Sequence, residues 1–563
     1  MRIITYKPKK TRDIKELVNR AYSLYPGKIA FKELSDEKQV HEYSYTRLYE
    51  DINAFGTKLI SMDMKGKHIA IIGENSYAWV LSYLTVINGV GVAVPLDKEL
   101  TDADIVSLLK RGDADAVICS ETFVDTIRDN LDACPRIKLC IVMNGKANEP
   151  FLSQDDLIND GYRLVGEGNK KYINAVVNPD EMCEIVFTSG TTGANKGVML
   201  SHKNLAAVVY GGMSYIKPGE VSFSVLPISH TYECSCHILG GIYCGITICF
   251  NDSLKRVAEN LKLFRPYFSV MVPLFLESMH REIWRRAKED NLDRHLRFGI
   301  RFSNMLRSIG IDMRRKIFEP VIEGFGGNLC LVVSGGAPLR PEIEKGMTDL
   351  GIDVLNGYGI TECGPLVSAN SLFAKKKGSV GRIIPGCRVR IDSPNKDGIG
   401  EVLVKGDNVM LGYYNDPQST KAVLTEDGWF RTGDLGRLSR RNYLYINGRK
   451  KNLIVLSNGK NVHPEEVEEK ILTLPYVKEV MVYAPPQGGL QGSITACIYL
   501  DEGYFPGGED IKARAKSDIR QMNRNLAAYK RITDIVFRDT EFDKTSTRKI
   551  KRNQILERNP ANA

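Results

Sequence analysis

A loop of glycine, hydroxyl and lysine residues follows an apolar run at residues 185–187. Glycines let backbone N–H groups surround an anion, hydroxyls add hydrogen-bond donors, and a lysine adds positive charge. The loop therefore suits a polyphosphate, although it does not match the G-x-x-x-x-G-K-[ST] pattern. The alternative is a polar turn between strands, but an ordinary turn needs fewer such residues. The candidate phosphate-binding residues are Thr188, Ser189, Gly190, Thr191, Thr192, Gly193 and Lys196.

Two later segments combine glycines with groups that could bind a nucleotide. The first follows the apolar run 329–333, where paired glycines would let a flat ring lie against backbone; a simple strand-to-helix turn is its alternative. Its residues are Gly335, Gly336, Ala337 and Pro338. The second, residues 356–362, reads Asn-Gly-Tyr-Gly-Ile-Thr-Glu and opens with the candidate Asn356.

Three side chains of this second segment could each meet part of a nucleotide. Tyr358 lies between glycines and could stack on a purine, and Thr361 could donate to a phosphate oxygen. Glu362 could hold Mg²⁺, because this hard cation prefers carboxylate and phosphate oxygens. A lone tyrosine or glutamate is more often a packing or surface residue, so the segment carries weight only with the others.

Charged residues in the second half of the chain could complete such a site. The carboxylate of Asp434 could accept hydrogen bonds from two ribose hydroxyls, and Arg449 lies in a basic, turn-rich segment. Lys549 lies in a run of charges near the C-terminus. Surface charge is the alternative for the first two residues. An unstructured basic tail is the alternative for the third, because a charge run is usually solvated.

Histidine and cysteine residues at 230–237 offer two further interpretations. His230 lies in Leu-Pro-Ile-Ser-His-Thr-Tyr-Glu, where a packed histidine at a turn is the alternative to a functional one. The segment Cys-Ser-Cys-His at 234–237 has metal-binding residue types, but zinc would need a second ligand pair at matching spacing. We therefore interpret residues 234–237 as a buried apolar segment.

The composition indicates a large globular chain with several folding units. Its 563 residues exceed the ~250–300 at which single cores stop growing, and 43% are hydrophobic and 26% charged. The net charge of +9 suits anionic small molecules or a negatively charged membrane surface, and no long basic block indicates nucleic acid. Twelve scattered cysteines predict free thiols and a cytoplasmic location. We expect neither a signal peptide nor a membrane span.

The order of apolar runs predicts the α/β class. From about residue 45 to 365, short apolar runs alternate with amphipathic helices, which indicates parallel sheets covered on both faces. From about residue 378, short strands alternate with turns, which indicates a small antiparallel sheet or β-barrel. We predict an N-terminal domain over 1–448, with α/β subdomains to about 370 and the β-barrel over about 371–448. A hinge at 449–452 and an α+β C-terminal domain over 453–563 would follow.

Six of these segments occur in the order of the acyl-adenylate-forming superfamily, which this chain resembles from about residue 14 to 552. The superfamily contains acyl-CoA synthetases, luciferases and the adenylation domains of peptide synthetases. Residues 226–233 and 325–339 look most like bacterial-type long-chain fatty acyl-CoA synthetases. The resemblance implies two flavodoxin-like parallel-sheet subdomains and a small β-barrel, followed by a smaller, mobile α+β C-terminal domain.

The resemblance also implies a role for each motif. The 188–197 loop binds phosphates, residues 335–338 line the adenine and acyl pockets, Tyr358 packs on adenine, Thr361 contacts the α-phosphate and Glu362 coordinates magnesium. His230 lies near the substrate carboxylate, Asp434 binds ribose, and Arg449 contacts ribose and α-phosphate. Lys549 is the catalytic lysine, and Gly459 lets the pantetheine arm of coenzyme A pass. The chain departs from the pattern at Arg548, which replaces a glycine, and at Phe542-Asp543, which replaces Leu-Pro.

The implied reaction joins two anions, a carboxylate and the α-phosphate of ATP, so positive charge must lie between them. We predict that Lys549 bridges both anions, and no protein nucleophile is needed because the carboxylate itself attacks. The expected cofactors are ATP, Mg²⁺ and coenzyme A, with a medium- or long-chain fatty acid as substrate. The alternatives are transfer to a carrier-protein thiol and a nucleotide-binding homologue that no longer turns over. Peripheral membrane contact would fit a lipid substrate, and nucleic acid is not an expected partner.

Overall fold

The structure is a computed structural model that describes residues 8–35, 37–145, 147–188, 195–456, 460–485, 494–504, 510–544 and 550–552. The chain divides into two units. The first comprises Met1–Arg388 and Val404–Phe430, and the second comprises Val389–Leu403 and Arg431–Ala563. The first unit contains two large, mainly parallel sheets and the second contains smaller ones, which confirms the predicted α/β class.

The first large sheet has eight strands in the order β19-β9-β8-β4-β3-β5-β6-β7. Strands β4, β3, β5, β6 and β7 run parallel, β8 runs parallel to β4, and β9 pairs antiparallel with both β8 and β19. The strands are β3 (His68–Ile72), β4 (Val92–Leu96), β5 (Ala116–Ser120), β6 (Leu139–Met143), β7 (Phe151–Ser153), β8 (Met182–Thr188), β9 (Lys196–Ser201) and β19 (Gly412–Tyr413).

The second large sheet has nine strands in the order β16-β15-β14-β13-β12-β10-β11-β1-β2. Its six central strands, from β14 to β1, run parallel, and antiparallel strands close both edges. The strands are β1 (Ile29–Leu34), β2 (Val40–Ser44), β10 (Val221–Ser224), β11 (Thr247–Phe250), β12 (Phe268–Met271), β13 (Leu331–Ser334), β14 (Asp353–Gly359), β15 (Leu366–Ala369) and β16 (Arg382–Ile383).

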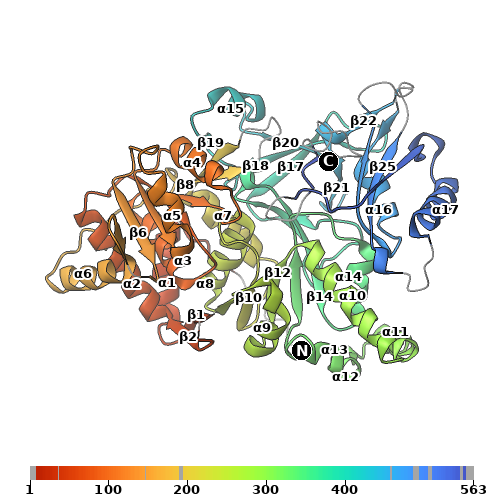
Figure 1. Cartoon of the computed structure of the whole chain (residues 1–563), viewed down its shortest axis with the longest axis horizontal. Helices are drawn as coiled ribbons and strands as arrows, with labels where there is room; N and C mark the ends of the chain where they lie inside the picture. Colours follow the sequence, from red (N-terminus) through yellow and green to blue (C-terminus); the bar gives the residue numbers. More distant parts are fainter. Residues whose placement is uncertain are drawn as a thin grey trace. The chain divides into compact units, whose positions relative to one another are not determined.

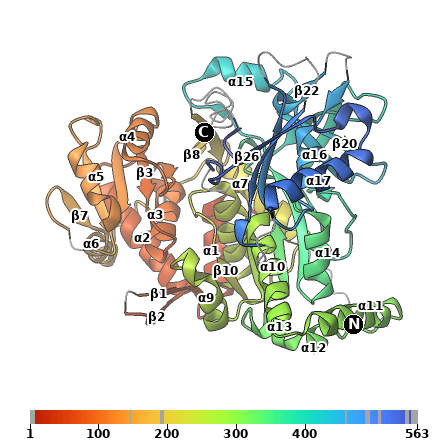
Figure 2. The same cartoon turned by 45° about the vertical axis from the view of Figure 1, so that its right-hand side comes forward.

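Helices connect these strands and cover the sheets (Figures 1 and 2). Several begin at a serine or threonine cap, as at Thr101, whose side chain accepts from the N–H of Asp104. The helices of this unit are α1 (Ile14–Leu24), α2 (Tyr45–Ser61), α3 (Tyr77–Thr85), α4 (Asp102–Arg111), α5 (Val124–Asp129), α6 (Gln154–Gly166), α7 (His202–Met213), α8 (Gly240–Cys244), α9 (Val257–Phe264), α10 (Pro273–Glu289), α11 (Asp293–Ser308), α12 (Arg314–Ile317), α13 (Glu319–Glu323), α14 (Pro341–Asp349) and α15 (Pro417–Val423).

Continuous apolar strands explain why these sheets are buried on both faces. Ala70 and Ile72 of β3 pack with Ile105 and Leu108 of α4 in one core cluster. Successive side chains of a strand point to opposite faces, and the intervening Ile71 is also fully buried. Because the second face needs a cover as well, the chain alternates strands with helices. Among the described residues, none of the helices is both long enough and apolar enough to span a bilayer.

In its described residues, the second unit contains smaller sheets and two α-helices. A four-stranded sheet has the order β17-β18-β20-β21, a two-stranded sheet pairs β22 with β23, and a three-stranded sheet has the order β24-β25-β26. The elements are β17 (Cys387–Asp392), β18 (Gly400–Gly406), β20 (Phe430–Leu438), β21 (Leu444–Arg449), β22 (Ile454–Val455), β23 (Asn461–Val462), β24 (Val477–Tyr483), β25 (Thr495–Leu500), β26 (Asp534–Arg538), α16 (Pro464–Ile471) and α17 (Ile511–Arg524).

Packing groups much of the four-stranded sheet with the C-terminal residues, whereas the predicted β-barrel over about 371–448 belongs to the N-terminal domain. Glu401 of β18 pairs with Arg431 at 3.1 Å and with Lys450 at 3.0 Å. The predicted hinge at 449–452 overlaps the short helix η6 (Lys450–Asn452), which lies inside the second unit. The domain limits at 448 and 452 therefore stay predictions.

We predict that Gly161→Ala destabilises the first unit. Helices α2 and α6 approach closely here, since a Cβ atom at Gly161 would lie 2.0 Å from the backbone oxygen of Ala54. Separating the two backbones should cost about 1–3 kcal/mol in the free energy of unfolding, measured by urea denaturation. Gly166→Ala in the same helix is the control, because nothing lies within 4 Å of its added Cβ. Equal stability of the two variants would contradict the prediction.

Candidate functional site

The carboxyl ends of β10, β12, β13 and β14 meet at one edge of the nine-stranded sheet. These strands are neighbours and parallel, and Ser334 of β13 lies opposite Asn356 of β14. The segment 335–338 follows β13 and therefore begins beside Asn356. Ligands of open α/β sheets bind outside such carboxyl ends. The structure thus brings together two of the glycine-rich segments that were predicted to bind one nucleotide.

Tyr232 links the His230 segment to this edge. Its backbone N–H donates to His230 Nδ1 at 3.2 Å, and its hydroxyl donates to the backbone oxygen of Val333 at 3.1 Å. A Cβ atom at Gly335 would lie 2.7 Å from Cζ of the Tyr232 ring. Glycine is needed at 335 because the ring occupies the space that a side chain would fill. His230 therefore lies two residues from a ring that packs on the 335–338 segment.

Asn356 and the 357–362 segment are held by the strands around them. The side-chain amide of Asn356 donates to Glu344 at 2.7 Å, and Glu344 pairs with Lys375 at 2.6 Å. Tyr358 pairs with Ser368 across the antiparallel β14–β15 ladder. Thr361 then begins the short helix η5 (Thr361–Cys363). This bonding fixes the amide of Asn356 within the protein.

Tyr413, which is not among the site residues predicted from sequence, contacts two residues that are. Its hydroxyl donates to Glu362 Oε1 at 2.9 Å, and Lys196 Nζ lies 4.8 Å from the centroid of its ring. Burial and the charge of Glu362 raise the pKa of Tyr413 well above its usual range, so the phenol stays protonated. β19 pairs with β9 at Tyr413 and Val198, which brings the tyrosine to the phosphate loop. The sequence Gly-Tyr-Tyr at 412–414 gave no local sign of this contact.

The 188–197 loop connects the antiparallel strands β8 and β9. Thr188 and Lys196 face each other in the ladder, and Gly190, Thr191, Thr192 and Gly193, with Ser189, lie outside the described residues. Arg111, a second residue missed from sequence, donates to the backbone oxygen of Asn195, and its guanidinium lies 5.9 Å from the Phe187 ring centroid. The hairpin therefore contains one positively charged residue, Lys196, and contacts a second, Arg111.

In the second unit, the structure pairs two of the predicted nucleotide contacts. Asp434 lies opposite Arg449 on the antiparallel strands β20 and β21. The two side chains form an ion pair at 3.0 Å, and that of Asp434 is 6% exposed against 42% for Arg449. The carboxylate is thus fixed by its partner, while the guanidinium remains accessible.

Lys549 and Gly459 lie outside the described residues, but both flanks of the lysine's segment are described. Lys544 bridges to Ile550, and the N–H of Lys551 donates to the backbone oxygen of Asp543 at 2.8 Å. Phe542, which replaces the family's leucine, is buried with Met481 and Cys497. These contacts anchor the chain on both sides of residues 545–549 and argue against an unattached basic tail.

An apolar pocket adjoins the edge at β13 and β14. It lies among α7, the helix η3 (Tyr232–Leu239) and the strands of the nine-stranded sheet. Its lining includes Val208, Met213, Tyr232, Phe268, Val333 and Gly357. The pocket shares Gly357 with the purine-binding candidate and Tyr232 with the His230 segment. Its volume of about 20 Å³ is close to that of one water molecule, so it marks an apolar contact between the two segments rather than a chamber for a ligand.

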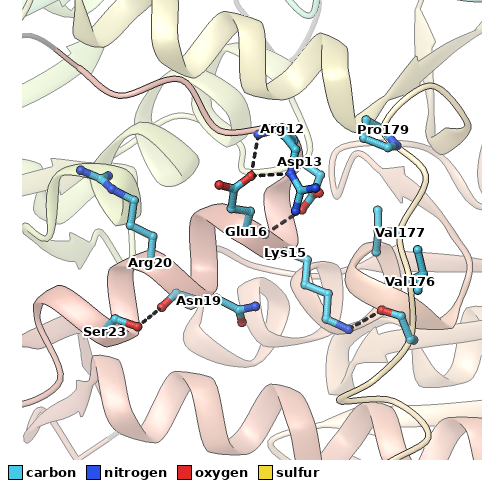
Figure 3. Close-up of a pocket in the computed structure, with 11 residues that line it drawn as sticks. Arg12, Asp13, Lys15, Glu16, Asn19, Arg20, Ser23, Val176, Val177 and Pro179 are labelled. Atoms are coloured by element: carbon cyan, nitrogen blue, oxygen red, sulfur yellow. Dashed lines mark hydrogen bonds and ion pairs between the residues drawn. The ribbon is translucent and has the colours of Figure 1, made fainter.

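A separate hollow of about 430 Å³ lies between α1 and residues 175–179 (Figure 3). Lys15 donates there to the backbone oxygens of Tyr172 and Ala175, at 2.9 and 2.8 Å. Burial, and to a lesser degree the charge of Lys65, lowers the pKa of Lys15 to about 8. None of the site residues predicted from sequence lines this hollow among the described residues, so we assign it no part in the chemistry.

Comparison with known proteins gives relatives and a shared fold. The long-chain-fatty-acid-CoA ligase FadD15 of Mycobacterium bovis is 25% identical over 550 residues, which cover 90% of this chain and 89% of the relative. The chloroplastic long-chain-fatty-acid-[acyl-carrier-protein] ligase AEE15 of Arabidopsis thaliana is 25% identical over 512 residues, 78% of this chain and 70% of the relative. The structure of the anthranilate CoA ligase AuaEII with anthranoyl-AMP covers 98% of each chain at 20% identity, with a TM-score of 0.78.

Family models match both parts of the chain. The AMP-binding enzyme C-terminal domain matches residues 451–560, and the AMP-binding enzyme model matches residues 18–414. The family predicted from the motifs is confirmed, with long-chain fatty acyl-CoA ligases among the relatives. Because the AMP-binding enzyme model matches more than half of the chain, the chain belongs to the AMP-binding enzyme family.

Proposed function

We propose that the protein is an ATP-dependent ligase that converts a carboxylic acid to its acyl-adenylate, releases pyrophosphate, and passes the acyl group to coenzyme A. The observation that carries the proposal is the sheet edge at β13 and β14, where the 335–338 segment begins beside Asn356 and the Tyr232 ring packs on Gly335. There an acyl chain would lie beside the predicted adenine site. Membership of the AMP-binding enzyme family supports the same chemistry.

Several positively charged groups have proposed roles toward the phosphates of ATP. Lys196 and the 188–194 loop would hold the leaving phosphates, and Arg449 and Lys549 would meet the α-phosphate. Preorganised positive groups of this kind stabilise the charge that develops in the transition state. His230 would lie near the substrate carboxylate, because Tyr232 fixes its segment beside Gly335. No protein nucleophile is used, since the carboxylate attacks phosphorus directly.

Glu362 fits a magnesium ion that is bound mainly through phosphates. One of its carboxylate oxygens accepts from Tyr413, which orients the group. No cluster of three or more His, Cys, Asp or Glu side chains suited to a metal occurs in the part of the chain that the structure describes. Mg²⁺ commonly binds through one or two carboxylates, substrate phosphates and water, so a single glutamate suits it. Bound there, the ion would neutralise charge on the leaving pyrophosphate.

A medium- or long-chain fatty acid is the proposed substrate, and coenzyme A the proposed acceptor. The relative FadD15 is named a long-chain-fatty-acid-CoA ligase, and the side chains around the small pocket at this edge are aliphatic and aromatic, which suits an apolar acyl group beside them. A carrier-protein thiol is the second candidate acceptor, because the relative AEE15 is named an acyl-carrier-protein ligase. We place the enzyme in the cytoplasm, with a peripheral membrane contact.

The direct test is carboxylate-dependent exchange of pyrophosphate into ATP across a panel of aliphatic and aromatic acids. We expect exchange with medium- or long-chain fatty acids and little with short or aromatic ones. Addition of free coenzyme A should then yield acyl-CoA, whereas product only on an added carrier protein would favour the second acceptor. The proposal would be wrong if none of the acids supported exchange.

We predict that Lys549→Ala lowers the adenylation rate by roughly 10²–10³-fold, as loss of one preorganised contact typically does. ATP binding, measured by calorimetry, should be retained because other groups hold the nucleotide. Lys551→Ala is the matched control, since it removes a neighbouring positive charge whose backbone is anchored to Asp543. If Lys551→Ala caused the larger loss, the catalytic lysine would be misassigned.

A stiffened hinge should separate the two half-reactions. We propose that the C-terminal domain rotates about this hinge between adenylation and thioester formation, as the resemblance to the family implies. Because proline fixes φ, Lys451→Pro should spare pyrophosphate exchange but slow thioester formation. Lys451→Ala is the control, as it removes the side chain without stiffening the backbone. Rapid-quench measurement of acyl-adenylate and acyl-CoA follows each step. An equal loss of both half-reactions in the proline variant would count against the rotation.

A further inference from the structure

Helix α11 exposes a line of large apolar side chains, which we call the α11 stripe. It consists of Phe298, Phe302, Met305 and the C-cap residue Ile309, which are 71%, 43%, 56% and 69% exposed. Their spacing of four, three and four residues places them on one face of the helix. The rings of Phe298 and Phe302 stack with centroids 6.4 Å apart. Ile311, 46% exposed, extends the apolar surface past the helix end.

The opposite face of α11 already supplies its contact with the core. Leu296 and Ile300 pack against the core of the nine-stranded sheet, and Ser303 is buried. The stripe is therefore not needed to hold the helix in place. A surface helix ordinarily turns a polar face outward, and contiguous exposed apolar surface usually marks an interaction site. In Figures 1 and 2, α11 lies at the margin of its unit, beside α12 and α13.

The charges on α11 indicate what covers the stripe. The helix carries four arginines and one aspartate. Arg294 and Arg301, four residues before and three after Phe298, flank the stripe and are exposed. Neither forms an ion pair within the described ranges, which omit short internal segments and both ends of the chain. Two copies of this positive face would repel each other, whereas an anionic surface would attract it.

We propose that α11 docks the protein on an anionic lipid bilayer. The α11 stripe enters the boundary between headgroups and acyl chains, and Arg294 and Arg301 contact lipid phosphates. Helices with an apolar face and arginine flanks lie in this interface, with the apolar face buried by about 5–10 Å. Each basic residue near the surface adds attraction to anionic lipid. This docking stands apart from the proposed ligase activity, because vesicle binding is measured without turnover.

Sedimentation of the full chain with vesicles tests the proposal. We expect binding to equimolar phosphatidylglycerol and phosphatidylcholine that weakens with salt, and much weaker binding to phosphatidylcholine alone. The double variant Phe298→Ser with Phe302→Ser should lower the affinity for the anionic vesicles by about tenfold or more. Arg294→Gln with Arg301→Gln should weaken binding about fivefold or more on anionic vesicles only.

The matched control replaces exposed apolar side chains outside α11. Leu24→Ser with Val176→Ser alters residues that are 52% and 91% exposed, and it should leave vesicle binding unchanged. Because the substituted residues are exposed, each variant should fold, and circular dichroism and the melting temperature check this. The proposal is overturned if the wild-type protein ignores anionic vesicles, or if the phenylalanine variant binds like wild type. It is also overturned if that variant changes only the oligomeric state in sedimentation velocity, which would make the stripe a self-association face.

Discussion

Parallel pairing of β13 with β14 positions the candidate site, because it fixes where two chain segments emerge. With Ser334 opposite Asn356, the backbone after each strand leaves the sheet at the same edge. Neither segment needs a long side chain to reach the other. Gly335 then leaves room for the Tyr232 ring, and Gly359 allows an approach in which a Cβ atom would lie 2.2 Å from the backbone oxygen of Pro365. Glycine is required at these positions by packing within the protein, before any ligand is considered.

Tyr413 extends this edge to the other large sheet of the first unit. It pairs with β9 through its backbone, contacts Lys196 through its ring and donates its hydroxyl to Glu362. A cation near a ring is worth about 0.5–2 kcal/mol, depending on solvation, so the ring restrains Lys196 without neutralising it. The hydroxyl likewise orients Glu362 and leaves its charge in place. One neutral side chain thus positions a positive and a negative group of the candidate site.

The sequence predicted local features well and long-range contacts poorly. The run at 68–72 became β3 at those residues, and Pro464 begins α16, because apolar runs and proline act on the backbone nearby. Tyr413 was missed because its partners Lys196 and Glu362 are distant in sequence. The ion pair of Glu401 with Lys450, within the second unit, likewise joins residues that are distant in sequence, and the predicted domain limits stay predictions. The exposed apolar face of α11 was not predicted either, because the spacing of apolar residues predicts a helix but not which of its faces packs on the core.

The Asp434–Arg449 ion pair explains how the second unit can keep a buried carboxylate when no nucleotide is bound. A buried carboxylate without a partner is costly, and the ion pair at 3.0 Å supplies one. The Arg449 side chain is 42% exposed, so an arriving phosphate can reach its guanidinium while Nε holds Asp434. In the proposed reaction the ribose-binding carboxylate is therefore fixed before the nucleotide arrives, and binding need not first separate two charges.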